Sequence, residues 1–303
     1  FRTHIARLET ATSQGRTDAT RFSGHRNPNV APAVLHRIVE TKEYLSAIPY
    51  SAEFKHSEGR AFPDYQAMLS ELNICDYVDG QGVQEVWVWS YHTDRVEPVE
   101  SNMSMGTLSK SAWNHTGFGD ISNSNQFNDM PQCKRTYTLY NYNYERTEAE
   151  TLHNHGHQIE RLFGWADADL FWNVFSGEQS YHNGVTDVPR RCGNTHFPPN
   201  ATKHYEYNNP TATLSDCDDW QPIECASQPR SASCGTQKMI GCSRWNCDAF
   251  QYLKWWMQHI PGPDNSYTYQ GHPLRNWWEL VDDFDAAIAG GNHCLYTDTC
   301  PLQ

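Results

Sequence analysis

The chain has 303 residues and carries 23 Lys and Arg against 36 Asp and Glu, which gives a net charge of -13. This acidic balance repels phosphate backbones and anionic lipid headgroups, so it argues against nucleic acid and anionic membranes as partners. No run of residues reaches the roughly 18 to 20 apolar positions that a membrane-spanning helix needs, and we expect no membrane insertion.

The cysteine content predicts a disulfide-bonded protein. Ten cysteines form an even set suited to five bridges, and there is no C-x-x-C pair of the kind that metal-binding thiolates use. The chain begins at Phe1 without an initiator Met, as a mature secreted form does. Three N-x-S/T sequons agree with secretion and predict glycosylation at Asn102, Asn114 and Asn200. We therefore expect an extracellular glycoprotein.

The first part of the chain predicts helices and strands in alternation. Residues 1–33 are polar and predict an N-terminal arm that lies on the domain, with a short helix near residues 3–12. We expect a strand within residues 34–50 and a helix over residues 63–72, where apolar side chains recur every three or four positions. Residues 83–89 are β-branched and aromatic, which is typical of a strand. This alternation favours an α/β fold.

A second strand and the longest helix follow a long polar loop. The strand is predicted over residues 136–144 and the helix over residues 146–165, with a short apolar helix at residues 167–175. A strand that leads directly into a helix places their junction at the carboxyl edge of the sheet, where α/β proteins build their sites.

The last part of the chain is rich in cysteine. Residues 178–248 are dominated by Pro, Asn, Ser and Cys and predict a disulfide-rich lobe, followed by helices near residues 248–259 and 276–289. The sequence thus predicts a single α/β domain over residues 34–303, with a central mixed sheet flanked by helices and a loop-dominated lobe. Its 16 Tyr and 11 Trp suit sugar binding, but core packing is the favoured interpretation.

The predicted long helix contains the string Glu150-Thr151-Leu152-His153-Asn154-His155-Gly156-His157-Gln158-Ile159-Glu160. At about 100° per residue, Glu150, His153, His157 and Glu160 fall within about 80° on one face. His153 and His157 are one turn apart, a spacing that lets two imidazoles reach one zinc ion, with Glu150 or Glu160 as third ligand or general base. A zincin helix has Glu where this sequence has Asn154, so the base of that mechanism is missing.

Gly156 lies inside this helix, where it costs about 1 kcal/mol relative to Ala. It therefore predicts that another segment packs closely there or that the helix bends. Two interpretations compete with a metal site. The helix face is either solvated, with Glu and His paired at i, i+3 and i, i+4, or it forms a hydrogen-bonded cluster without metal.

Two loop histidines are candidates for a further metal ligand. His92 follows the strand predicted at residues 83–89, and His196 lies beside prolines and near Cys192, where a bridge supplies rigidity. Taken singly, each is also explained as an ordinary hydrogen-bonding loop residue.

Two groups of acids suggest other chemistry. Glu97 and Glu100 resemble the paired carboxylates of glycoside hydrolysis, but solvated loop acids are the favoured interpretation. The acidic cluster at residues 216–219 could hold calcium, but an acidic turn beside a disulfide is the favoured interpretation.

Three strings of the chain resemble a group of uncharacterised secreted proteins, and the resemblance covers its central half. The resemblance implies no activity, but it implies that the three strings belong to one site. The strings are Tyr142-Asn143-Tyr144-Glu145-Arg146-Thr147, Leu152-His153-Asn154-His155-Gly156-His157 and Thr195-His196-Phe197-Pro198-Pro199-Asn200.

The leading functional hypothesis is a secreted metal-dependent hydrolase that acts on extracellular glycan or peptide. Zinc would be held by His153 and His157 with His196 or His92. The alternative is a non-catalytic glycan-binding or structural cell-surface or filament glycoprotein. A metal-free glycoside hydrolase is the third possibility.

Overall fold

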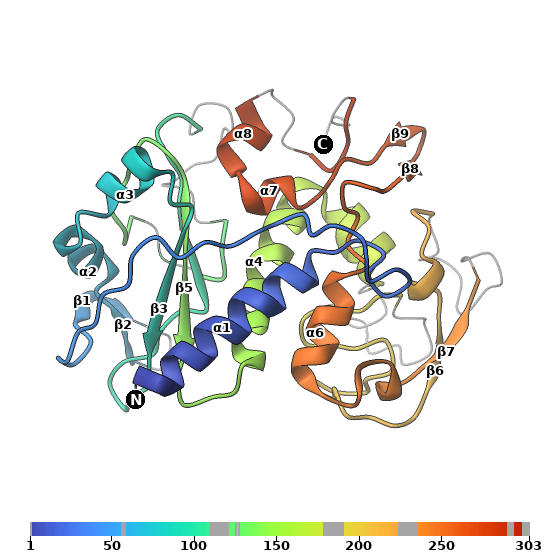
Figure 1. Ribbon diagram of the computed structural model, residues 1–303, viewed down its shortest axis with the longest axis horizontal. Helices are drawn as coiled ribbons and strands as arrows, with labels where there is room; N and C mark the ends of the chain where they lie inside the picture. The colour runs from blue at the N-terminus through green and yellow to red at the C-terminus, as the bar shows by residue number, and fades with distance from the viewer. Residues whose placement is uncertain are drawn as a thin grey trace.

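The computed structural model describes residues 2–55, 59–109, 121–124, 126, 128–177, 191–223, 236–289 and 294–298. A three-stranded sheet lies on one side of the molecule and a disulfide-bonded lobe on the other, with a long helix between them (Figure 1). Helices combined with small mixed sheets fit the predicted α/β class.

The main sheet has the strand order β3-β5-β4. The strands β3 (Glu85–Ser90) and β5 (Tyr137–Asn143) run parallel, with Glu85 opposite Thr138 and Ser90 opposite Asn143. The strand β4 (Ser101–Ser104) pairs antiparallel with the other edge of β5. The two strongest strand predictions, at residues 83–89 and 136–144, are therefore confirmed within one or two residues.

Side chains alternate across this sheet. One face packs against α2 (Tyr65–Glu71) and α3 (Ile74–Gln81), and β3 and β5 contribute Val86, Val88 and Leu139 to that apolar core. The helix predicted at residues 63–72 is confirmed as α2, and the Asp64 side chain caps it by accepting from the backbone N of Ala67. The opposite face of the sheet carries Tyr140 and Tyr142 toward the long helices.

The polar N-terminal segment forms a long packed helix, α1 (Arg2–Ala19), instead of an arm with a short helix at residues 3–12. Its Arg16 is fully buried and forms an ion pair with Glu85 of β3. The helix lies against α4 (Ala149–Ala166) and α6 (Ala249–Met257). The local polarity of this segment suggested an exposed arm. The fold buries Arg16 because Glu85, far along the chain, pairs with it.

The strand predicted within residues 34–50 is absent. Residues 34–49 contain no strand, and β1 (Tyr50–Lys55) begins only at the end of the predicted range. It pairs antiparallel with β2 (Ala61–Pro63).

The cysteine-rich segment forms a lobe around a small hairpin-like sheet of β6 (Thr213–Ser215) and β7 (Lys238–Ile240). A short π-helix (Asp169–Ser176) and two 3₁₀ turns (Cys217–Asp219 and Cys242–Trp245) complete it. The bridges Cys192–Cys217 and Cys242–Cys247 lie in this lobe, as predicted, and Cys75–Cys133 joins α3 to the segment before β5. Cys294 is also disulfide-bonded, and Cys225, Cys234 and Cys300 lie outside the described residues.

Aromatic side chains fill the larger of the two apolar cores, which supports the core interpretation of the Trp content. The tryptophans that are almost completely buried are Trp220, Trp245, Trp256, Trp277 and Trp278.

The C-terminal helices follow the prediction in part. The first is α6, and Asp248 caps it by accepting from the backbone N of Gln251. The predicted helix at residues 276–289 is divided into α7 (Glu279–Asp282) and α8 (Phe284–Ala289), because Asp283 between them leaves helical geometry at φ −138° and ψ 82°. Between these elements β8 (Thr268–Tyr269) pairs with β9 (His272–Pro273).

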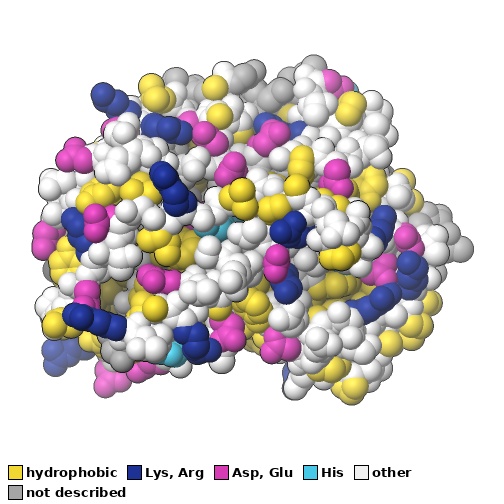
Figure 2. All heavy atoms as spheres, in the orientation of Figure 1, with side chains coloured by type: hydrophobic (Ala, Val, Ile, Leu, Met, Phe, Trp, Pro, Cys, Tyr) yellow, Lys and Arg dark blue, Asp and Glu magenta, His cyan; other side chains and the backbone are white. Residues whose placement is uncertain are grey.

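Two observations bear on partners. Within the described part of the chain, no helix combines the length and apolar character needed to cross a membrane. On the face shown in Figure 2, basic and acidic side chains are interspersed.

Candidate metal centre

The helix α4 is anchored on several sides, which sets its rotation about its own axis. His153, His157 and Glu160 are thereby turned toward the segment 192–197 of the lobe. The anchoring contacts are Asn154 Nδ2 to the Asn141 carbonyl oxygen at 2.8 Å, Gln158 Nε2 to the Ile121 carbonyl oxygen at 2.7 Å, and His155 Nδ1 with an Arg16 guanidinium nitrogen at 2.8 Å.

The segment that faces the helix is a fixed turn. The side-chain oxygen of Asn194 accepts from the backbone N of His196 and of Phe197, each at 3.0 Å. The Tyr252 hydroxyl donates to the carbonyl oxygen of Asn194 at 2.7 Å, and the bridge at Cys192 holds the start of the turn. The backbone of His196 is therefore held from several directions.

Gly156 allows this turn to approach the helix. A Cβ atom added to Gly156 would lie 2.6 Å from Oγ1 of Thr195, closer than two such atoms can come. This finding confirms the close packing predicted from the glycine. It also explains how His196 reaches the helix histidines.

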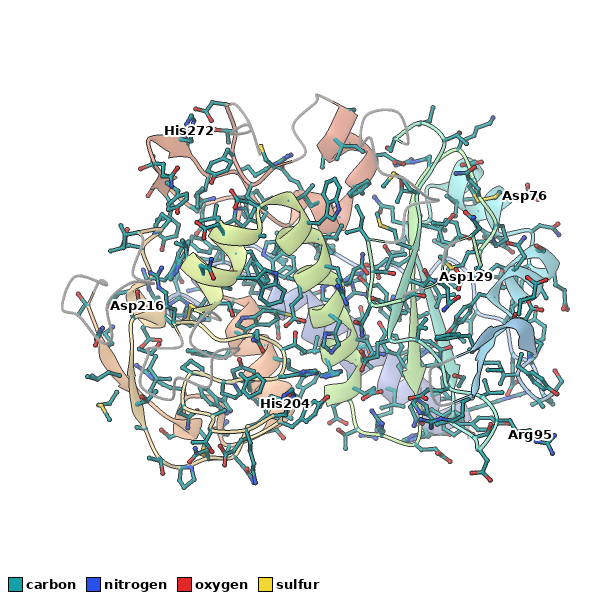
Figure 3. The ribbon with its side chains drawn as sticks, turned by 180° about the vertical axis from the view of Figure 1, so that it is seen from behind. Asp76, Arg95, Asp129, His204, Asp216 and His272 are labelled. Atoms are coloured by element: carbon teal, nitrogen blue, oxygen red, sulfur yellow. A yellow bond between two sulfur atoms is a disulfide. The ribbon has the colours of Figure 1, made fainter. Side chains whose placement is uncertain are left out.

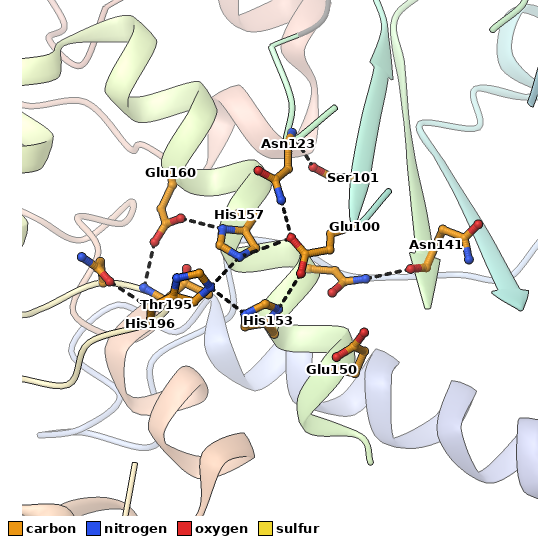
Figure 4. Close-up of polar contacts among 12 residues, drawn as sticks. Glu100, Ser101, Asn123, Asn141, Glu150, His153, His157, Glu160, Thr195 and His196 are labelled. Atoms are coloured by element: carbon orange, nitrogen blue, oxygen red, sulfur yellow. Dashed lines mark hydrogen bonds and ion pairs between the residues drawn. The ribbon is translucent and has the colours of Figure 1, made fainter. Parts of the chain in front are cut away.

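Three histidines converge where the turn meets the helix (Figure 4). The Nε2 atom of His196 lies 3.0 Å from Nε2 of His157 and 3.1 Å from Nε2 of His153. The ligand atoms of all three lie within 4.8 Å of one another. Three imidazoles bound to one zinc at about 2.0 to 2.1 Å in tetrahedral geometry would have nitrogens roughly 3.3 to 3.4 Å apart, so the group has nearly this spacing.

Hydrogen bonding alone does not account for the group. A ring nitrogen has one in-plane position, which holds either a hydrogen or a lone pair. The Nε2 atom of His196 therefore serves at most one of its two short contacts as a linear hydrogen bond, whatever the protonation states. A shared cation would satisfy all three nitrogens together.

Glu160 organises both sides of this group. One carboxylate oxygen lies 2.8 Å from Nδ1 of His157, and the other accepts from the backbone N of Thr195 at 2.8 Å. The carboxylate thus places the proton of His157 on Nδ1 and leaves Nε2 free to bind. A carboxylate behind a ligating histidine is the usual second layer of a metal site. Glu160 therefore orients His157 and the turn at Thr195, where the sequence predicted a third ligand or base.

The protonation preferences of His153 and His196 fit ligands ready to bind. Burial, together with the neighbouring His157 and His196, lowers the pKa of His153 to about 3. Burial and His157 lower the pKa of His196 to about 4. Burial also lowers the pKa of His157, but the Glu160 carboxylate outweighs it and the net direction is upward. At neutral pH, His153 and His196 are therefore neutral, the form that binds metal.

Glu100 lies beside the group, immediately before β4. One of its carboxylate oxygens is 3.4 Å from Nε2 of His157, and the other is 3.4 Å from Nδ1 of His153. Asn123 donates to the same carboxylate. Burial raises the pKa of Glu100 above its usual range, despite the opposing effect of His157. The mutually close ligand atoms do not include Glu100, so its geometry suits proton transfer better than ligation.

Tyr205 forms part of the rim, although no sequence motif pointed to it. Its ring centroid lies 4.5 Å from that of His196 and 5.8 Å from that of His153. The side chain is about half exposed, and the backbone is left-handed at φ 62°. A bulky residue in this conformation is uncommon and often lies at a functional site.

Three other predicted site residues lie elsewhere. Glu150 pairs with Arg146 one turn earlier on the helix, at 2.9 Å. Glu97 pairs with Arg60 at 2.6 Å. His92 is not among the mutually close ligand atoms found in the described residues. The structure therefore distinguishes Glu100 and Glu160, which lie against the histidines, from Glu97 and Glu150, which pair with arginines, and it distinguishes His196 from His92.

Two of the three predicted glycosylation sites are buried and hydrogen-bonded. Nδ2 of Asn102 is buried and lies 2.9 Å from both carboxylate oxygens of Asp129, on the sheet side of the molecule (Figure 3). Nδ2 of Asn200 is also buried and donates to the carbonyl oxygens of Asn209 and Thr211. These nitrogens are inaccessible in the folded chain. Asn114 lies outside the described residues.

The acidic cluster predicted to bind calcium is neutralised by basic side chains. Asp216 pairs with Arg191 at 2.7 Å, Asp219 pairs with Lys238 at 2.7 Å, and Asp218 pairs with Arg244. Among the described residues, these acids do not form a group of three mutually close ligand atoms, and the calcium site stays a prediction.

Comparisons of this chain with protein-family models, with curated proteins and with solved structures found no match. The argument for function therefore rests on the site itself.

Proposed function

We propose that the protein is a secreted zinc-dependent hydrolase whose metal is held by His153, His157 and His196. The observation that carries the proposal is the convergence of three Nε2 atoms at 3.0 and 3.1 Å, with Glu160 behind one of them. Imidazole nitrogens suit zinc better than calcium or magnesium, which prefer oxygen. The disulfides support the extracellular location.

Three protein ligands are the pattern of catalytic zinc sites, which keep a fourth position for water. Zinc in such a site lowers the pKa of its bound water to about 7 and so supplies a nucleophile at neutral pH. Glu100 lies next to two of the three ligands, and burial raises its pKa. We assign it to accept the proton from the attacking water and to pass it to the leaving group.

The rim favours a glycan over a peptide. The half-exposed ring of Tyr205 stands over the histidine group and offers a flat apolar surface. Sugar rings stack their C–H faces on such surfaces. We therefore assign Tyr205 to substrate binding.

The test is hydrolysis of glycan and peptide libraries by the oxidised protein, with zinc content measured in parallel. Glu100→Gln should lose at least 100-fold in kcat yet keep its zinc, as expected for loss of a general base. His157→Ala should lose both zinc and turnover. Glu97→Gln is the matched control, because Glu97 pairs with Arg60, and it should retain both. Turnover that survives both a chelator and His157→Ala would refute the proposal.

The same experiment separates the alternatives. Glycan binding without turnover by the zinc-loaded protein would favour a non-catalytic binding protein. Turnover lost in both Glu97→Gln and Glu100→Gln, but insensitive to chelator, would favour a metal-free glycosidase.

A further inference from the structure

A second group of potential metal ligands joins three distant segments of the chain. His25 follows α1, Asp218 lies in the 3₁₀ turn after Cys217, and His259 follows the end of α6. Their ligand atoms lie within 4.8 Å of one another. The two imidazole rings are stacked, with centroids 3.6 Å apart and planes inclined by 27°. The sequence analysis did not identify this group.

The hydrogen bonds of His259 fix which of its nitrogens is free. Its Nδ1 atom lies 2.7 Å from the carbonyl oxygen of Trp255, which only accepts, so Nδ1 carries the hydrogen. Nε2 then presents a lone pair. This atom is buried without a hydrogen-bond partner, and it faces Oδ1 of Asp218 at 3.7 Å. When His259 is neutral, two buried acceptors therefore face each other, an arrangement that is unfavourable unless a proton or a metal cation lies between them.

The second histidine is arranged in a similar way. Nε2 of His25 lies 3.3 Å from the carbonyl oxygen of Asp218, to which it can donate. Its other nitrogen, Nδ1, is buried and has no hydrogen-bond partner. Arg26 Nε has a single hydrogen and lies 2.7 Å from the same carbonyl oxygen and 2.9 Å from Nε2 of His25. When it donates to the carbonyl oxygen, the nearer of the two, Nε2 of His25 keeps its own hydrogen and Nδ1 stays free.

We propose that His25 Nδ1, His259 Nε2 and Asp218 Oδ1 bind a second divalent transition-metal ion of the zinc class. Two imidazoles and one carboxylate are a donor set that zinc uses. The separation of 3.7 Å between His259 and Asp218 is too long for a hydrogen bond, but it is close to the roughly 3.3 to 3.4 Å between two ligands of one tetrahedral zinc.

The surroundings supply the outer contacts that metal sites usually have. The Trp255 carbonyl orients His259, and Arg244 donates to Oδ2 of Asp218, the oxygen not assigned to the ion. Such contacts hold ligands in place before the ion arrives. The ion would connect the segment after α1 to the lobe and to α6, so its role is structural.

A cavity of about 380 Å³ gives access to the site and is lined in part by His25 and Asp218. Its other lining residues include the basic side chains of Arg26, Lys238, Arg244 and Lys254. Basic and acidic side chains also lie side by side on the lobe surface in Figure 2. Positive charge beside the cation weakens its binding, so we expect this site to have the lower zinc affinity of the two and to take water or an anion as a fourth ligand.

Zinc counting on the full, oxidised chain tests the proposal. Native mass spectrometry after zinc loading and buffer exchange should find two ions per chain in the wild type. His25→Asn and His259→Gln should each bind one ion, as should His157→Ala, and the His25→Asn/His157→Ala double variant should bind none. His272→Gln, which alters a solvent-accessible histidine paired with Asp298, is the matched control and should bind two.

The outcomes distinguish the two sites. A wild type that binds one ion, lost in His157→Ala and kept in His25→Asn, would overturn this inference and leave the proposed function standing. A wild type that binds one ion, kept in His157→Ala and lost in His25→Asn, would overturn the proposed function and leave this inference standing. Because His259 is fully buried and its variant can misfold, the half-buried His25 supplies the decisive substitution.

Discussion

The two histidine groups have similar donor atoms but opposite charges around them. At α4, the carboxylates of Glu160 and Glu100 lie against the histidines. At the second group, the single carboxylate of Asp218 is paired with Arg244, and the guanidinium of Arg26 lies beside His25. Carboxylates behind imidazoles strengthen them as ligands, whereas nearby cations weaken the site for a metal ion.

This difference in charge suits the α4 group to a catalytic role and the second group to a structural role. The α4 group combines three ligands with an adjacent acid whose pKa is raised, which is what a hydrolytic site requires. The second group joins three segments and has basic side chains at its cavity, so it suits a structural ion. One disulfide, Cys192–Cys217, connects them, because Cys192 begins the turn of His196 and Cys217 precedes Asp218.

The largest expected effect comes from breaking that disulfide. The Cys192→Ser/Cys217→Ser variant should lose about 3 kcal/mol of unfolding free energy, since the bridge closes a loop with a sequence separation of 25. It should also weaken zinc binding at both groups. Urea denaturation and zinc titration measure these effects. Loss of affinity at only one group would show that the bridge does not couple them.

The next effect concerns the carboxylate behind His157. Glu160→Gln keeps the size of the side chain but cannot accept from both His157 and Thr195, so zinc affinity should fall by roughly 10- to 100-fold. Glu150→Gln, on the same helix, is the control and should leave affinity unchanged because Glu150 pairs with Arg146. Competition with a chelating dye measures both variants. Equal losses would contradict the role assigned to Glu160.

A buried histidine outside both groups shows what burial does without a metal. Burial and the neighbouring Arg16 lower the pKa of His36 to about 4, although Glu85 opposes them. The unfolded value is about 6.5, so the unfolded chain binds more protons between these two pH values. The stability contribution is therefore complete above about pH 6.5 and is lost as the pH falls toward 4.

For this residue, we expect about 2 kcal/mol less unfolding free energy at pH 5 than at pH 7. His36→Gln should remove that part of the pH dependence. Urea denaturation of both proteins at the two pH values gives the comparison. An unchanged slope in the variant would show that His36 titrates normally in the fold.

The smallest effect comes from the glycine between the helix histidines. Gly156→Ala gains about 1 kcal/mol of helix propensity but places a methyl group against Thr195. The overpacking should cost about 1 to 3 kcal/mol, so the net loss of stability is on the order of 1 kcal/mol. The turn that carries His196 should move, and zinc binding at α4 should weaken while the second group keeps its ion. A stabilised variant with unchanged zinc affinity would contradict the close contact.

The sequence predicts the parts of this fold that local patterns determine. The strands β3 and β5 are continuous β-branched and aromatic runs, and α2 and α4 have helical apolar spacing. The burial of α1 was not predictable, because Arg16 is stabilised by Glu85, 69 residues away. The single helix expected at residues 276–289 failed because Asp283 departs from helical geometry between α7 and α8.

In the candidate site, too, the sequence predicts only what local spacing determines. His153 and His157 are neighbours on one helix, so their spacing alone places them together. The choice of His196 over His92, and of Glu100 over Glu97, depends on tertiary packing. The group of His25, Asp218 and His259 is still less visible, since its first two members are 193 residues apart.

The central claim is that His153, His157 and His196 bind zinc, and X-ray absorption at the zinc edge of the His25→Asn variant tests it most directly. We predict one zinc per chain, with a first shell at about 2.0 to 2.1 Å and the outer-shell scattering of three imidazole rings. A shell of water or carboxylate oxygens without imidazole scattering, or the absence of stoichiometric zinc, would contradict the claim.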